Sequence, residues 1–444
     1  MTLDYAGAEE RFGHIIARLE KAPDFLATAK ANLTETSELQ AESTIEELNG
    51  LKNLINNDIK SELPDTLESR FTPAAEAAVA AIDDFAQALR SLPKGKDWRV
   101  GRTLYEQKLA ALGAPEGTSL DDVLTQLDTD FDEAYKHVIE AARPIHREIY
   151  GGQRAPSDYA LMRDILDVVS DQNRLRTGDG LLNRVEENVD EAKQFMQRQE
   201  LLPIPTIPLS LDDTPSFLRA KYPVDAFQAP PLLNASQGAT YWVTPIPSNW
   251  SAVQTRDKLR EYNNFKLKIV AVDGFARYVQ AALAADNENE TFRLVRNVDG
   301  NRAYTRGFNW YIVDSAIADG YQGRGGQFQM TWWKYKLEQL ASAILDIRLH
   351  AMNMSEADAR EMLERKVFME RGAIDSAVRR IQLAPTDNTL AYVGSKQWNT
   401  VREKYTEATT DFSLQSFHGK ALRAGAMPGD ELVYITTEGK GRLR

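Results

Sequence analysis

Hydrophobic residues recur every three or four positions over most of the first 200 residues. The spacing is clearest in two sets: Phe12, Ile15, Ile16 and Leu19, and then Ile45, Leu48, Leu51, Ile55 and Ile59. Such a period places the apolar side chains on one face of a helix, with the acidic and amide residues between them on the other. The pattern therefore predicts helices, with breaks at Pro64, at Pro73 and in the segment 91–98. Two longer helices are expected over 119–149 and 157–200.

The pattern changes between residues 201 and 250. Nine prolines fall between Leu201 and Pro247, charges are few, and short apolar runs such as ATYWVTPIP at 239–247 replace the helical period. Proline lacks a backbone donor and favours extended geometry in the residue before it. This stretch is predicted to form loops and a small, partly edge-exposed sheet.

The helical period returns after Ser251 and continues to the end of the chain. Apolar positions from Leu259 to Leu283 form one stripe and predict a single long buried helix. Further helices are expected at about 305–320, 328–352, 371–383, 387–405 and 412–424. Ser355 is the predicted N-cap of another helix. The chain is thus expected to be mainly α, with segments 1–200, 201–250 and 251–444 in one continuous fold.

Composition narrows the class of protein. The 444 residues are 43% hydrophobic, include no cysteine, and carry a formal net charge of −12. The basic residues are scattered, so neither a nucleic-acid surface nor an anionic membrane surface is expected. No apolar run reaches the roughly 18 residues of a membrane span, and the first 20 residues are acidic and amphipathic. We therefore expect a cytoplasmic protein without disulfides.

Familiar catalytic motifs are missing from the sequence. The five histidines lie at least nine residues apart, so no histidine pair has metal-ligand spacing. The glycines at 320–326 and the Gly394-Ser395-Lys396 run lack the phosphate-loop pattern, and the former predicts a hinge between helices. No serine lies in a G-x-S-x-G elbow. Considered alone, Tyr241, Arg348 and Tyr392 are packing residues, and His350 is a core or C-terminal capping histidine.

An ordered series of segments nevertheless resembles a known family. The series is AxxNL at 29–33, DWRVGRTLYE at 97–106, ATYWVTPIP at 239–247, LREYNN at 259–264, ILDIRLH at 344–350, LAYVGSKQW at 390–398 and FSLQSFHGKAL at 412–422. It is similar to the bacterial family catalogued as domain of unknown function 885. The resemblance implies a large two-lobed helical fold like that of the thermostable zinc carboxypeptidases of the gluzincin clan, with a deep groove.

The sequence departs from that family where its members resemble metallopeptidases. Typical members carry H-E-x-x-P-G-H after LREYNN and E-G-W later, and these look like metal ligands and a general base. Here the second histidine falls on Arg277, the first on Ala271 or Asp273, and the E-G-W segment on 306–308, which begins with Arg306. A guanidinium is always protonated and offers only hydrogen-bond donors. No zinc or other cofactor is therefore expected, although the family implies zinc.

The resemblance leaves a set of groove candidates rather than a catalytic centre: Asp273, Arg277, Arg306, Arg348, His350, Tyr392 and Tyr241. The leading hypothesis is a metal-free pseudoenzyme that binds a peptide or a small carboxylate ligand in its groove. One alternative is a hydrolase that uses Asp273, His350 or Tyr392 in acid–base chemistry without a metal. Another is a structural or interaction protein whose contact surface lies on the acidic helical half.

Overall fold

The structure is a computed structural model that describes residues 3, 5–298 and 300–439. It is mainly helical with a small sheet near the middle of the chain, which confirms the predicted fold class. The described residues divide into two compact units. The first comprises Met1–Trp98, Asp212–Ala226 and Trp242–Thr244, and the second Arg99–Leu211, Phe227–Tyr241 and Pro245–Arg444.

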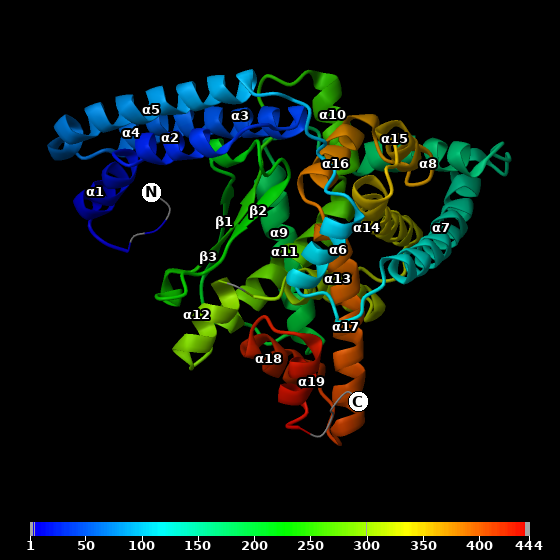
Figure 1. The fold of residues 1–444 in the computed structure, drawn as a ribbon. Helices are drawn as coiled ribbons and strands as arrows, with labels where there is room; N and C mark the ends of the chain where they lie inside the picture. Colours follow the sequence, from blue (N-terminus) through cyan, green and yellow to red (C-terminus); the bar gives the residue numbers. More distant parts are fainter. Residues whose placement is uncertain (1–2, 4, 299, 440–444) are drawn as a thin grey trace. The chain divides into compact units, whose positions relative to one another are not determined.

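The first unit is a small helical bundle with its own core. Its helices are α1 (Ala8–Leu19), α2 (Ala22–Asn32), α3 (Glu38–Asn53), α4 (Lys60–Glu62) and α5 (Glu68–Ser91), with a π-helical turn over Leu54–Ile59 and 3-10 turns over Asp65–Leu67 and Ser216–Leu218. Figure 1 shows α2 and α3, in blue, running beside α5. Phe12, Leu48, Phe71 and Ile82 are buried together in the core.

Pro73 does not end a helix, contrary to the prediction from sequence. It lies inside α5, where it removes one backbone hydrogen bond. Phe71, Ala74 and Ala75 on either side of it are buried. The burial of this apolar face outweighs the missing hydrogen bond, so the helix continues through the proline.

Three short strands in the described residues form one sheet. They are β1 (Leu209–Asp213), β2 (Asp225–Gln228) and β3 (Ala239–Val243), in the order β1-β3-β2. In β3, Ala239, Tyr241 and Val243 are buried and alternate with partly exposed residues, as expected for a strand with one covered face. The strand assignment for ATYWVTPIP is therefore confirmed for its first five residues.

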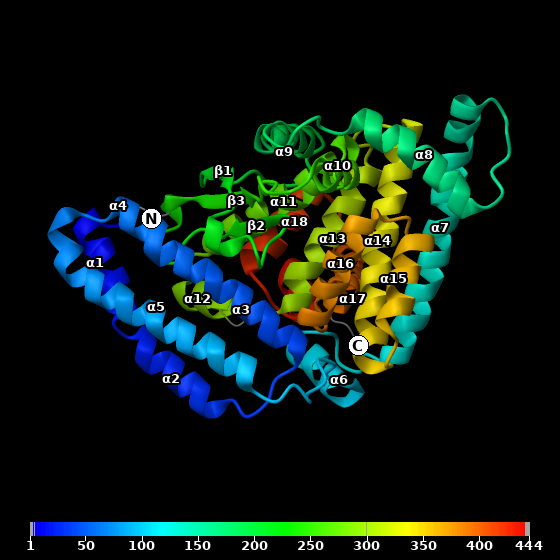
Figure 2. The same cartoon turned by 90° about the horizontal axis from the view of Figure 1, so that it is seen from above.

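The second unit contains the longer helices. They are α6 (Arg102–Ala111), α7 (Leu120–Tyr150), α8 (Asp158–Asn173), α9 (Leu181–Arg198), α10 (Ala252–Glu261), α11 (Asn264–Ala285), α12 (Glu290–Val298), α13 (Arg302–Ala318), α14 (Gly326–Ala351), α15 (Glu356–Arg365), α16 (Arg371–Leu383), α17 (Asp387–Ala408), α18 (Leu414–Ala424) and α19 (Gly429–Thr436), and a 3-10 turn spans Ala235–Gln237. Figure 2 shows α7 running alongside α14, while α9 packs on α11 and α13 on α17.

Two predicted long helices are each divided in the structure. The expected helix over 157–200 becomes α8 and α9, since the T-G-D-G run at 177–180 between them has poor helix propensity. The expected helix after Ser251 becomes α10 and α11, because Asn263 is extended and its Oδ1 accepts hydrogen bonds from the N–H groups of Phe265 and Lys266. The apolar stripe is continuous, but a side-chain cap starts a new helix.

Glycines set how closely α13 and α17 approach. A Cβ atom on Gly307 would lie 2.1 Å from the carbonyl carbon of Gly394, and one on Gly394 would lie 1.9 Å from the carbonyl oxygen of Ala303. Neither position has room for a side chain. The glycines of the R-G-F and LAYVGSKQW segments therefore serve helix packing, while the predicted hinge at 320–326 is confirmed as the turn between α13 and α14.

A buried carboxylate of α14 completes the start of α17. Asp346 is fully buried and accepts backbone hydrogen bonds from Thr386 (3.0 Å), Asn388 (3.1 Å) and Thr389 (3.1 Å). Thr386 has a φ of 80° and supplies no side-chain cap of its own. The first N–H groups of a helix have no partner within it, and Asp346 supplies that partner from another helix.

Candidate functional site

Asp273 and Arg277 lie one turn apart on α11. A terminal nitrogen of Arg277 donates to Oδ2 of Asp273, and the Asp273 side chain is 11% exposed. Tyr335 of α14 lies close by, and burial, followed by the charge of Asp273, raises the pKa of its hydroxyl. The negative charge of Asp273 and the positive charge of Arg277 therefore balance each other within α11.

Tyr241 of β3 packs against this helix at a glycine. A Cβ atom on Gly274 would lie 2.6 Å from the Tyr241 ring, so the ring occupies the space that a side chain would need. Tyr241 is 1% exposed. Its place beside α11 is therefore a tight packing contact.

Arg306 binds an acid on another helix. It is half-exposed on α13, and its Nη2 donates to Oδ2 of Asp387 on α17 at 2.8 Å, while Arg302 contacts the other oxygen of Asp387 at 3.3 Å. Arg277 and Arg306 therefore bind different acids, Asp273 on α11 and Asp387 on α17.

Arg348 and His350 lie near the end of α14 but face different surroundings. Arg348 is partly exposed and binds Asp128 of α7 at 2.8 Å. His350 is fully buried, its Nε2 donates to the carbonyl of Ile381 at 3.0 Å, and its ring lies 6.2 Å from that of Tyr105. These contacts fit the core histidine, one of the two interpretations left open by the sequence.

Tyr392 on α17 lines an open cleft. The cleft has a volume of about 530 Å³ and is bounded by the start of α7, one face of α17 and the start of α19; we call it the α7–α17–α19 cleft. It is lined by Pro115, Thr118, Ser119, Asp122, Val123, Gln126, Tyr392, Val393, Lys396, Gln397, Thr400, Val401, Gly429 and Asp430. Its volume lies in the range of small-molecule sites.

A shared carboxylate orders the polar groups at this cleft. Oδ2 of Asp130 accepts from Tyr392 Oη at 2.9 Å and from Lys396 Nζ at 2.8 Å, while Gln126 donates to Oδ1 at 2.7 Å. Burial opposes the charge of Asp130, but the hydrogen bonds from Lys396 and Gln126 outweigh it and lower the pKa of the carboxyl. Burial and the Asp130 charge raise the pKa of Tyr392, so its hydroxyl stays protonated.

The sequence interpretation missed a buried charge network in the second unit. Lys266 Nζ contacts Glu261 Oε1 at 2.6 Å and Glu338 Oε2 at 2.5 Å, and Lys334 contacts Glu338 Oε1 at 2.5 Å. The side chains of Lys266 and Glu261 are 6% and 2% exposed. The signal in the sequence that could have revealed this network was Lys266, which lies inside the apolar stripe of α11. A lysine at a buried position needs an acidic partner, since buried charges in proteins are paired.

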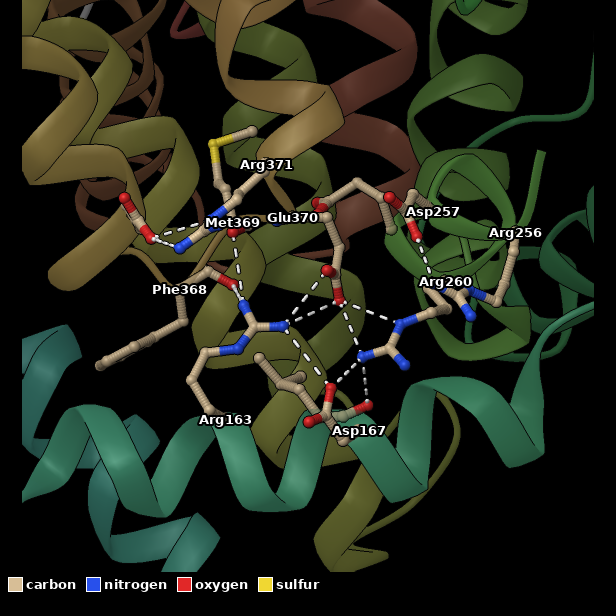
Figure 3. A network of polar contacts seen from close by, with 12 residues as sticks. Arg163, Asp167, Arg256, Asp257, Arg260, Phe368, Met369, Glu370 and Arg371 are labelled. Atoms are coloured by element: carbon tan, nitrogen blue, oxygen red, sulfur yellow. Dashed lines mark hydrogen bonds and ion pairs between the residues drawn. The ribbon is translucent and has the colours of Figure 1, made fainter. Parts of the chain in front are cut away.

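Figure 3 shows a second part of the network, in which two arginines converge on one carboxylate. Arg163 and Arg260 each contact Glu370 at 3.2 Å, and Arg260 also binds Asp167. The backbone N–H of Glu370 donates to Oε2 of Glu261 at 3.1 Å and thereby joins the two parts. A cavity of about 10 Å³ beside them has room for roughly one water molecule.

The network has equal numbers of acids and bases: Glu261, Glu338, Glu370 and Asp167 against Lys266, Lys334, Arg260 and Arg163. Each charge is compensated at short range. Burial opposes ionisation of Glu261, but Lys266 and Lys334 hold its pKa well below the usual range. The network links α8, α10, α11 and α14 by ion pairs, and its positive groups are bound to carboxylates of the protein.

The residues present do not fit a zinc ion. Zinc needs lone pairs from imidazole, thiolate or carboxylate groups, whereas Arg277 and Arg306 offer N–H donors that are already bound to carboxylates. Within residues 3, 5–298 and 300–439, no group of three or more His, Cys, Asp or Glu side chains has a metal-binding arrangement. In the same residues, no helix is long and apolar enough to span a membrane.

Comparisons with known proteins identify the family and the fold. Residues 1–433 match the family described as "Bacterial protein of unknown function (DUF885)". A solved "putative lipoprotein of unknown function" from Shewanella oneidensis is 22% identical, with a TM-score of 0.75 over 97% of this chain and 79% of that one. A "putative lipoprotein" from Colwellia psychrerythraea is 16% identical, with a TM-score of 0.75 over 98% and 76%.

At these identities the two solved structures share the fold with this chain, and their similarity says nothing further about function. The search of curated proteins found no match. The family match covers nearly the whole sequence, in agreement with the ordered segments from 29–33 to 412–422. The chain is therefore a member of the bacterial family DUF885.

Proposed function

We propose that the protein binds a peptide or a small carboxylate ligand and does not hydrolyse it by zinc chemistry. The observation that carries this proposal is the Asp273–Arg277 ion pair on α11. By the resemblance to zinc carboxypeptidases, Arg277 falls at the position of the second histidine, and the first falls on Asp273 or Ala271. Arg306, at the matching position of the E-G-W carboxylate, is likewise bound to an acid. On this proposal the protein is a pseudoenzyme, in which ion pairs occupy the positions of the metal ligands and of the E-G-W carboxylate.

The acid–base alternative finds less support. Asp273, His350 and Tyr392 contact three different groups, namely Arg277, the carbonyl of Ile381 and Asp130. A general base and its acid partner must reach the same substrate atoms. The binding role is therefore favoured over hydrolysis without a metal.

The test combines metal loading, turnover and binding. The protein is dialysed against zinc, its metal content is measured, and a peptide library is assayed for hydrolysis with zinc and with chelator. Calorimetry in chelator then measures binding of the same peptides. We expect substoichiometric metal, no turnover and saturable binding of at least one peptide. One zinc per chain together with peptide turnover, or no binding by any peptide, would overturn the proposal.

A further inference from the structure

The α7–α17–α19 cleft combines an apolar floor with separated charges. Val393 and Val401 of α17 are buried, as is Tyr392. Val123 of α7 also lines the cleft. A ligand that presents hydrocarbon to this floor would remove apolar surface from water, which favours binding. The floor therefore suits a ligand with an aliphatic or aromatic side chain.

Lys396 supplies a positive charge at the cleft. Its side chain is 50% exposed, and Nζ is held at 2.8 Å by Asp130 on the edge of the cleft. An ammonium group carries three N–H donors, and the bond to Asp130 uses one of them. The remaining donors can bind a ligand carboxylate without breaking the contact that positions Lys396.

Two carboxylates supply negative charge on the same lining. Asp122 lies in the first turn of α7 and Asp430 in the first turn of α19, and both are exposed. Tyr392 donates its hydroxyl hydrogen to Asp130, so the lone pairs of Oη remain available as acceptors. The lining thus offers acceptors for a cation as well as the Lys396 donors for an anion.

The residues that line the cleft carry a net negative charge, which argues against a ligand that carries only negative charge. Asp122 and Asp430 against Lys396 leave one net negative charge, and Asp130 adds another beside it. A ligand that carried only a carboxylate would meet this excess of negative charge. A ligand with an ammonium and a carboxylate group satisfies both kinds of partner.

We infer that the α7–α17–α19 cleft binds a small zwitterion with apolar side chains, such as a dipeptide with free amino and carboxyl ends. The inference rests on the proposed function and names the ligand class and the place where it binds. In this site Lys396 binds the carboxylate, the acceptors of Asp122, Asp430 and Tyr392 surround the ammonium group, and the valines contact the side chains.

The test measures binding of three related probes by calorimetry in chelator: leucyl-leucine, its C-terminal amide and its N-acetyl derivative. The amide lacks the carboxylate, and the acetyl derivative lacks the ammonium group. Loss of a charge-assisted hydrogen bond is worth a factor of about ten or more in Kd. We expect leucyl-leucine to bind about tenfold more tightly than either derivative.

Lys396→Met should weaken leucyl-leucine binding about tenfold and abolish the preference over the amide. Lys396→Arg keeps the charge and should retain most of the affinity. Lys404→Met is the matched control, because Lys404 lies on the same helix, pairs with Glu407 and is absent from the cleft. Unchanged thermal unfolding of the Lys396→Met variant would exclude a folding defect as the cause.

Three results would overturn the inference: equal affinity for all three probes, unchanged binding in Lys396→Met, or no binding of leucyl-leucine. If other peptides still bind the protein in any of these cases, the proposed function stands and the cleft assignment fails. Zinc-dependent turnover would instead overturn the proposed function, whatever the effect of Lys396→Met on binding.

Discussion

Lys266 shows how strongly one residue can depend on its neighbours. Its ammonium group is buried on α11 between Glu261 and Glu338. Burial opposes its charge, yet the two glutamates raise the pKa of Lys266, so it remains protonated. Removing Lys266 leaves the two glutamates to share the single positive charge of Lys334.

Lys266→Met should therefore lower the free energy of unfolding by about 3–5 kcal/mol. Lys420→Met, which removes an exposed partner of Glu438, serves as the control and should have a much smaller effect. Chemical denaturation monitored by circular dichroism measures both. A change as small as that of the control would show that the network contributes little to stability.

Two buried residues, Asp346 and His418, should change the free energy of unfolding with pH in opposite directions. Burial raises the pKa of Asp346 to about 7, although hydrogen bonds from Thr386 and Thr389 act in the other direction. Its stabilisation is present below the unfolded pKa of about 3.9 and is lost as the pH rises through 7. Burial lowers the pKa of His418 to about 4, so its stabilisation is present above about 6.5 and is lost as the pH falls through 4.

Single substitutions should separate these two contributions between about pH 4 and pH 6.5. Relative to the unsubstituted protein, Asp346→Asn should make stability rise more steeply with pH, and His418→Gln should make it rise less steeply. Each change in slope is at most about 1.4 kcal/mol per pH unit. Urea denaturation at several pH values measures the slopes, and parallel curves for the three proteins would contradict the assignment.

At the residue scale, the sequence could identify candidates but not their partners. Arg306 is separated by 81 positions from Asp387, its ion-pair partner. His350 binds a carbonyl 31 positions away, and Tyr392 binds Asp130, 262 positions away. Helical period and local motifs carry no information about such contacts, since the contacts depend on which helices pack together. For the same reason, the cleft beside Tyr392 could not be predicted from the sequence.

At the element scale, the crossing of α13 and α17 is set by Gly307 and Gly394. Gly394→Ala would place a methyl group against the carbonyl of Ala303, in a contact between two backbones that no side-chain movement relieves. We expect the substitution to lower the free energy of unfolding by about 1–3 kcal/mol.

Gly372→Ala provides the control for that experiment, because the added Cβ atom would meet only Asp257 at 4.0 Å, an ordinary contact. This glycine lies within α16, so alanine there should be neutral or stabilising by up to about 1 kcal/mol. Thermal unfolding compares the two variants. Equal effects would indicate that helix propensity, and not the close crossing, decides the outcome at Gly394.

Element type was largely predictable from the hydrophobic period, whereas element boundaries depended on single side chains. The start of α15 was predicted correctly because Ser355 is a local cap that accepts from the N–H of Asp358. The break at Asn263 was missed because the apolar stripe runs across it, and Pro73 was taken as a break because the burial of its neighbours is a tertiary property. Local capping is encoded nearby, while burial is decided by the whole fold.

At the scale of the whole molecule, each unit has an apolar core of its own. Phe71 lies in the core of the first unit, and Leu345 of α14 is fully buried in the second. Separate cores favour separate cooperative transitions. We expect calorimetry to resolve more than one unfolding transition, with Phe71→Ala lowering the Tm of one and Leu345→Ala lowering the Tm of another.

A single transition that both substitutions shift equally would contradict this expectation. The predicted groove, the division at residues 200 and 250, and the cytoplasmic location remain predictions. The comparisons with known proteins show the family and the fold of the chain.

The Asp346 contact with α17 also bears on the order of folding. The first N–H groups of α17 find their acceptor on a residue 40 positions earlier in the chain, on another helix. The start of α17 is therefore incomplete until α14 has docked, and its first amides should acquire protection from hydrogen exchange in the same kinetic step as α14. In pulse-labelling experiments, the amides of Thr386, Asn388 and Thr389 should become protected with those of α14 and later than the middle of α17.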